Sequence, residues 1–293
     1  MSVYSIKDLE HLSGIKAHTI RIWEQRYELF SPQRTSTNIR YYNDDDLKLI
    51  LNIATLKNHG YKISKIVAMP PQLREQEVRK IGEEDQTYED QMSVLTLAMI
   101  DLDEEAFSLA LEKTIEHAGF ENTMIRIIYP FMRKIGILWL TNSINPAQEH
   151  FISHLVRQKV IAATDKLQIN ESGPLFLLFL PEGELHELGL LFANFLLRKR
   201  GAKTVFFGQT VPLEALEEVY HKLNPEYILT AMTTKPETGE VQKYITRLGK
   251  RFQECEILIT GNRIVGQPLD IPKNIRIMNQ FEDLLAYTPQ LAV

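Results

Sequence analysis

The sequence has very little cysteine and no long apolar run. Cys255 is the single cysteine among 293 residues, so neither an internal disulfide nor a cysteine-based zinc site can form, and we expect this side chain to be packed. The longest apolar run, Leu175 to Leu180, is far below the ~18 to 20 residues that span a bilayer. Residues 1–20 lack the pattern of a signal peptide. The sequence therefore predicts a cytoplasmic protein with no membrane association.

Several catalytic signatures are also missing. There is no Walker P-loop and no G-x-S-x-G element, and the stretch 261–266 retains only two glycines of a dinucleotide fingerprint. His150 and His154 have the spacing of a zinc pair on one helix face, but no third ligand is identifiable. We therefore do not expect an enzyme of these classes.

Charge is distributed unevenly along the chain. Residues 1–80 contain 13 Lys and Arg against 9 Asp and Glu, a net charge of +4, which leaves −9 on the remainder. A basic N-terminal part joined to a larger acidic body favours a segment that faces a polyanion, with a separate task for the body.

Proline positions and apolar spacing predict a multidomain protein. Pro70 and Pro71 end an apolar helical pattern, and a polar stretch dominated by Glu, Gln, Arg and Lys follows. Apolar spacings of three and four then predict a central four-helix bundle, in which Asn145, Pro146 and Gln148 form a helix start. The predicted divisions are a DNA-binding domain at 1–71, a polar helix or linker at 72–91, the bundle at 92–170 and an α/β domain at 171–293.

The last division alternates short apolar runs with helical patterns. Strands that lack polar alternation are buried on both faces, as in a parallel sheet. The pattern predicts a doubly wound, flavodoxin-like (Rossmann-like) parallel sheet, whose ligands bind at the carboxyl ends of the strands. The predicted strands are Leu175 to Leu180, Thr204 to Phe207, Tyr227 to Ala231, Ile257 to Ile259 and Ile275 to Met278, and the helices are 186–200, 213–223 and 238–252.

Residues 4–41 have the pattern of a winged helix-turn-helix. A helix at 4–12, a Ser13-Gly14 turn and a helix at 16–26 have the spacing of a motif that reads the major groove of DNA. The polar, turn-rich stretch that follows is long enough for a wing. The predicted DNA-binding residues are Lys16, His18, Thr19 and Arg21 in the second helix, and Arg34, Asn38, Arg40 and Tyr41 in the wing.

These residues resemble the MerR-type transcription regulators. The stretch TIRIWEQRYELFSPQRTSTNIRYYNDDDL contains a T-x-R-x-[YW]-E core, a P-x-R and a final R-x-Y before an acidic helix start. The resemblance covers about residues 3–70. It implies that Arg21 and Arg40 contact promoter DNA, whereas Trp23 and Leu29 pack the small core. The dimerising coiled coil usual in the family is not expected after Pro70-Pro71, so a homo-oligomer would form through the C-terminal body.

A Glu-x-His-x-x-Gly motif follows the first predicted strand. Glu184, His186 and Gly189 open the next helix at the expected ligand crevice. A neutral imidazole coordinates a metal, and a nearby carboxylate holds the opposite ring nitrogen and raises its basicity. Gly189 leaves room for a bulky planar group. Alone, this short motif also fits an ordinary surface or capping histidine.

A second motif, W-x9-EH, lies in the predicted bundle. Together with the MerR-like head and the E-x-H-x-x-G motif, it resembles the cobalamin-dependent, light-sensing MerR repressors of the CarH and LitR type. That resemblance makes His186 the lower axial ligand of cobalt and Glu184 its partner. It also implies that Trp139, Glu149 and His150 cap the upper face, where the 5'-deoxyadenosyl group of adenosylcobalamin sits.

The chain departs from that family at three places. Leu140 replaces a histidine that binds cobalt after light, so a light-driven two-histidine state is not expected. The Ser/Thr-x-Leu turn that lines the nucleotide tail is matched only by Thr230-Ala231-Met232 or by Thr233-Thr234. Of the Gly-Gly pair, Gly261 remains and Asn262 replaces the second glycine.

Three functions stay open on these residues. The first is a DNA-binding transcription regulator whose body binds a corrinoid and couples the ligand to oligomerisation and promoter binding. The second is a MerR-like regulator whose body is degenerate, binds another small molecule, or serves only as an interaction scaffold. The third is a corrinoid-dependent methyl carrier, which the DNA-reading head disfavours.

Overall fold

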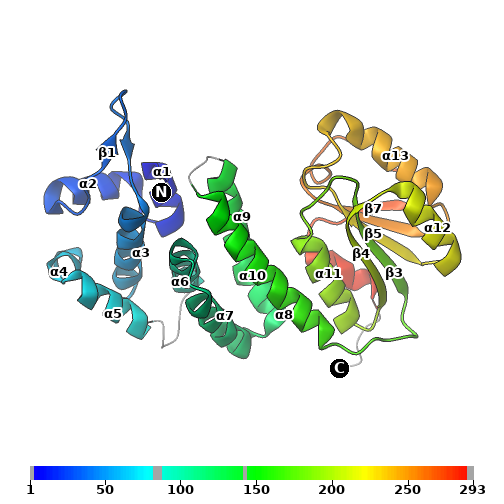
Figure 1. Ribbon diagram of the computed structural model, residues 1–293, viewed down its shortest axis with the longest axis horizontal. Coiled ribbons are helices and arrows are strands. Elements are labelled where there is room, and N and C mark those ends of the chain that lie inside the picture. Colours follow the sequence, from blue (N-terminus) through cyan, green and yellow to red (C-terminus); the bar gives the residue numbers. More distant parts are fainter. Residues whose placement is uncertain (1–2, 82–87, 141–143, 289–293) are drawn as a thin grey trace. The chain divides into compact units, whose positions relative to one another are not determined.

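The computed structural model describes residues 3–81, 88–140 and 144–288 (Figure 1). The chain forms two compact units, Met1–Leu155 and Val156–Val293. The boundary between these units falls inside one long helix, α10 (Pro146–Asp165). In the described part of the chain, no helix is long and apolar enough to cross a bilayer.

Residues 3–68 form the predicted winged helix-turn-helix. A capping box on Ser5 starts the first helix, and Gly14, at φ +72°, ends it in the left-handed conformation that the turn requires. The wing is an antiparallel pair in which Arg34 lies opposite Arg40. The elements are α1 (Ile6–Ser13), α2 (Ala17–Tyr27), β1 (Gln33–Arg34), β2 (Arg40–Tyr41), α3 (Asp44–Asn58) and α4 (Ile63–Ala68).

The stretch that follows the head is partly helical. The stretch predicted as a polar helix or linker contains α5 (Pro71–Ile81), which Tyr61 of the head contacts through a 2.8 Å hydrogen bond to Glu77. In addition, Nε2 of His59, at the end of α3, lies 2.8 Å from the buried carboxylate of Asp90 on α6 (Tyr88–Asp101). These contacts explain why the head and the start of the helical region share one compact unit.

The central region is helical, as predicted. The Asn145 side chain accepts from the amide of Ala147 at 2.9 Å, while Gln148 reaches back to the Asn145 amide, which is the predicted helix start. A π-helical segment separates α8 from α9. The described helices are α6 (Tyr88–Asp101), α7 (Glu104–Ala118), α8 (Phe120–Thr123), the π-helix η1 (Met124–Ile128), α9 (Tyr129–Leu140) and α10.

The second unit is the predicted parallel α/β fold. Its five strands lie in the order β4-β3-β5-β6-β7, and every neighbouring pair is parallel. The strands are β3 (Leu175–Pro181), β4 (Lys203–Val211), β5 (Tyr227–Ala231), β6 (Glu256–Thr260) and β7 (Ile275–Ile277). The helices that connect or flank them are α11 (Leu188–Lys199), α12 (Leu213–Leu223), η2 (Thr238–Glu240), α13 (Val241–Arg251) and η3 (Phe281–Tyr287).

Apolar side chains cover both faces of this sheet. One core lies between the sheet and helices α12 and α13, and a second lies between the sheet, α11 and the segment after β7 (Figure 1). Cys255 is packed in the first core, where burial raises the pKa of its thiol to about 11. Because both faces are covered, the carboxyl edge of the strands is the place left for a ligand.

Gly261 sets the path of the chain at that edge. It follows β6 with φ +106°, and an added Cβ would lie 2.4 Å from the Met232 carbonyl oxygen, next to the end of β5. The sequence motif that suggested a cofactor role for Gly261 therefore has a structural explanation, namely close approach of two backbone segments.

We predict that Gly261→Ala destabilises the second unit by about 3 kcal/mol, since it combines backbone strain with a steric clash. Gly266→Ala is the matched control, because Gly266 also has a positive φ but has no atom within 4 Å of a Cβ. Its cost should be near 1 kcal/mol, from the left-handed backbone alone. Urea unfolding of both variants measures the difference, and equal losses would contradict the clash.

Candidate functional site

The candidate site is built around Glu184, whose side chain is completely buried. It lies on the loop after β3, beside the loop after β5, because β3 and β5 are neighbours in the sheet. Its Oε2 accepts from the backbone amides of Thr233, Thr234 and Lys235 at 2.6 to 3.0 Å. Its Oε1 accepts from the amides of Leu185 and His186, both at 3.0 Å. One carboxylate therefore fixes two loops at once.

The same carboxylate orients His186. Glu184 Oε1 lies 2.6 Å from Nδ1 of the ring, and the His186 side chain is 58% exposed. A carboxylate at Nδ1 favours the tautomer that carries its proton there, which leaves the lone pair on Nε2. This is the arrangement that a metal-binding imidazole requires. The prediction that the motif opens a helix is wrong in detail, because α11 begins only at Leu188 and His186 lies on the loop.

The hydrogen bonds also determine the charge of Glu184. Burial alone raises the pKa of this carboxyl, but the His186 side chain and the amides of Lys235, Thr234 and His186 outweigh burial and hold its pKa well below its ordinary value. The group is therefore a carboxylate at any physiological pH.

Two further contacts fix the loop that carries His186. The side-chain amide of Gln209, on β4, donates to the Leu185 carbonyl at 2.7 Å. The guanidinium of Arg157, on α10, donates to the nearly buried carboxylate of Glu187 at 2.5 Å. No local signal in the sequence indicated these contacts, because the partners are 24 and 30 residues apart in the chain.

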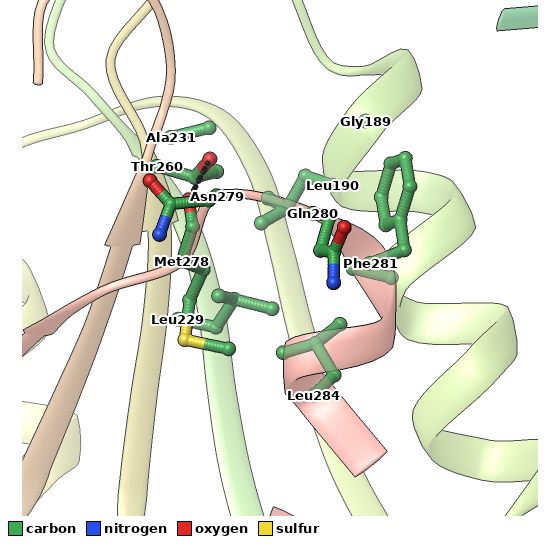
Figure 2. A pocket seen from close by; sticks show the side chains of 11 residues that line it. Gly189, Leu190, Leu229, Ala231, Thr260, Met278, Asn279, Gln280, Phe281 and Leu284 are labelled. Carbon is green, nitrogen blue, oxygen red and sulfur yellow. Dashed lines mark hydrogen bonds between the residues drawn. The ribbon is translucent and has the colours of Figure 1, made fainter. Parts of the chain in front are cut away.

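An apolar cavity of about 110 Å³ opens beside Gly189, with Leu190 from the same helix in its wall (Figure 2). No atom lies within 4 Å of a Cβ added at Gly189, so this glycine leaves open space at the site. The rest of the lining comes from α11, from the ends of β5 and β6 and from the segment after β7, namely Ala193, Leu229, Ala231, Thr260, Met278, Asn279, Gln280, Phe281 and Leu284.

Three residues considered for the nucleotide tail lie outside this lining. Thr233 donates its amide to Glu184, and Gly261 packs against Met232. Asn262 is exposed. Thr233 and Gly261, which the sequence assigns to cofactor binding, are therefore not in the wall of this cavity. That assignment remains a prediction. Asn262 is not in this wall either, so the replacement of glycine there does not narrow this cavity.

The predicted upper-face residues belong to the helical region. His150 Nδ1 lies 2.7 Å from Glu149 Oε2, so this pair is also a carboxylate-oriented imidazole, and the His150 side chain is 68% exposed. Trp139 and Leu140 lie on α9, but their side chains are outside the described part of the structure. Across the described residues, no group of three or more His, Cys, Asp or Glu side chains is placed to hold a metal ion.

The second helix of the head presents its predicted residues at its start. Lys16 is the residue before α2 and pairs with Glu10 at 3.2 Å. His18 and Arg21 are exposed on α2, and Thr19 is half-buried. Trp23 is buried in the core of the head, as expected.

The wing residues have clear structural roles. Arg34 donates to the backbone and side-chain oxygens of Asn38, which fixes the turn at the wing tip. The Tyr41 hydroxyl donates to Gln33 across the wing. The half-buried Arg40 pairs with Glu24 of α2 at 3.1 Å. Sequence reasoning treated Glu24 only as part of a motif, whereas the structure shows that it joins the wing to the recognition helix.

The pKa of Glu184 predicts how its contribution to stability depends on pH. Since its folded-state pKa is lowered, its stabilisation is present above its ordinary value of 4.5 and is lost as the pH falls below it. Glu184→Gln should therefore lose about 1 to 3 kcal/mol at pH 7, and the gap from the unmodified protein should narrow below pH 4.5. Thermal unfolding between pH 7 and 3 measures this gap, with the exposed Glu182→Gln as control. A gap that is independent of pH would contradict the assignment.

Two domain families match this chain. The MerR HTH family regulatory protein matches residues 4–72, and the B12 binding domain matches residues 93–163. The second match covers the helical region from α6 to most of α10, not the parallel sheet.

Relatives extend the similarity over most of the chain. This chain is 27% identical over 257 residues to the HTH-type transcriptional repressor CarH of Myxococcus xanthus, and the alignment covers 84% of each chain. It is 26% identical over 225 residues to the repressor CarA of the same organism, covering 76% of this chain and 74% of that one.

A solved structure shows the fold of the C-terminal part. The monomethylamine corrinoid protein of Methanosarcina barkeri superposes with a TM-score of 0.56 at 13% identity, over 69% of this chain and 98% of that one. At this identity the likeness concerns the fold alone. The domain matches therefore show a MerR-type helix-turn-helix head and a B12 binding domain in one chain, which is similar to the CarH repressor over most of its length.

Proposed function

We propose that this protein is a DNA-binding transcription regulator whose C-terminal body binds a corrinoid, with adenosylcobalamin as the form that its resemblance to the CarH type favours. The observation that carries the proposal is the pair formed by His186 and the buried Glu184 carboxylate. An imidazole fixed at Nδ1 and more than half exposed is suited to coordinate a metal that arrives from outside the protein.

The surroundings of His186 fit a flat macrocycle. Leu185, next to His186 in the chain, is an apolar residue that is 62% exposed, which would supply van der Waals contact. The apolar cavity beside Gly189 would accept part of the nucleotide tail. A bound corrinoid would supply a cobalt ion, and the His186 imidazole would hold it as a ligand. Glu149 and His150 are proposed to contact its other side, as the resemblance implies.

Regulation would follow from differential binding. A corrinoid that binds one arrangement of the protein more tightly than another stabilises that arrangement, and the shift cannot exceed the difference in binding free energy. We propose that the favoured arrangement alters self-association of the C-terminal body. A homo-oligomer holds several heads on one promoter and multiplies otherwise weak binding. The side chain at Leu140 is not a metal ligand, so a light state with two histidines on cobalt is not proposed.

A methyl carrier is the second candidate, because the corrinoid protein of M. barkeri shares the fold. The MerR-type head favours the regulator, since a carrier has no need to read DNA. Turnover of a methyl donor by the purified protein would favour the carrier instead.

We predict that the protein retains adenosylcobalamin through gel filtration in the dark and that His186→Ala weakens this binding by at least tenfold, with a changed visible spectrum, because the axial ligand is lost. His221→Ala, an exposed histidine on α12, is the matched control and should bind as the unmodified protein does. If no chromophore is retained, the corrinoid proposal is contradicted. The body would then bind another small molecule or serve as an interaction scaffold.

We predict different effects for the two DNA-contact arginines. Arg21→Ala should weaken promoter binding and reduce the salt dependence by about one released counterion, with thermal stability unchanged, because Arg21 is exposed. Arg40→Ala should also lower the thermal stability of the head, because it leaves Glu24 without its cation. Fluorescence anisotropy at several salt concentrations and thermal unfolding measure the two effects. Unchanged affinity in both variants would place the DNA face elsewhere.

A further inference from the structure

The exposed face of α2 contains one residue that does not suit a purely ionic surface. His18, Ile22 and Gln25 share this face because they are spaced by four and three residues, and Arg21 and Arg26 flank it. The four polar side chains are all exposed. Ile22 lies at the centre of the face and is 51% exposed.

Nothing within the described residues of the head accounts for an isoleucine there. Ile20 and Trp23 are the buried residues of α2 and form its side toward the core. Isoleucine is a poorer helix former than the Lys, Glu or Gln that usually occupy exposed positions. Its apolar surface would be removed from water only by a partner that covers this face.

The neighbours of Ile22 determine the chemistry of that partner. Arg21 and Arg26 favour an anionic surface, and Gln25 offers paired hydrogen-bonding groups. The major groove of DNA combines all three requirements, since phosphates line its edges, base edges offer donors and acceptors, and thymine adds an apolar methyl group. An acidic protein surface would satisfy the arginines but gives no reason for the isoleucine.

We propose that Ile22 is a specificity-determining residue that packs against the 5-methyl group of thymine in the promoter. The inference rests on the proposed DNA-binding function and goes beyond it by assigning one base-reading contact. Removal of one buried methyl group changes affinity by about fourfold, which sets the size of the expected effect.

The test first selects duplexes from a random pool with the full-length protein and then replaces each thymine of the selected site by uracil, one at a time. Uracil keeps the Watson–Crick pairing and lacks only the methyl group. We expect the protein to lose about fourfold in affinity at one or two positions. Ile22→Ala should bind the thymine site about as weakly as the unmodified protein binds the uracil site, and should not respond to uracil at those positions.

Two measurements separate this contact from a general loss of binding. Ile22→Ala should leave the salt dependence unchanged, because no charge is removed. Leu109→Ala, on α7 and 53% exposed, is the matched apolar control and should keep the full response to uracil.

The outcomes are distinguishable. A pool with no enriched duplex would overturn the DNA-binding function and the inference with it. An enriched duplex with no uracil response, or with the same response in Ile22→Ala, would overturn the inference alone. Unchanged DNA affinity of Ile22→Ala would also overturn it.

Discussion

The buried carboxylate of Glu184 is the interaction on which the candidate corrinoid site depends. An ionised carboxyl group is stable inside a protein only when hydrogen bonds replace the water it has lost. Here five backbone amides, a threonine hydroxyl and the His186 ring surround it. Those donors come from the loops after two adjacent strands, so satisfying one charge also fixes both loops and the orientation of the imidazole.

In the head, a single carboxylate also joins two elements. Glu24 on α2 accepts from the Arg40 guanidinium, and the Tyr42 hydroxyl lies 3.4 Å from its other oxygen. The recognition helix and the wing are therefore joined through one carboxylate. The residues that identify the family in the sequence include this acid and its partners. The motif thus records a structural contact between the helix and the wing.

The two similarities to corrinoid proteins concern different parts of the chain. The B12 binding domain match lies on the helical region, whereas the fold similarity covers the parallel sheet as well. We propose the Glu184–His186 pair as the chemical link between them, because an imidazole oriented by a carboxylate is suited to bind a metal. The regulatory proposal thus depends on residues from both parts of the chain, with the proposed ligand donor on the loop after β3.

The sequence by itself determined the order of the elements, because apolar period, caps and prolines are local properties. Strand β5 and helix α12 begin and end where predicted, and the helix start at Asn145 has the expected hydrogen bonds. The motif also identified Glu184 and His186 as partners, since they are only two residues apart. Only the tertiary structure decided which distant residues join them. The backbone contacts of Thr233 and Gly261 and the side-chain contacts of Gln209 and Arg157 were not predicted, because the packing of neighbouring strands and helices sets such contacts and no local spacing records it.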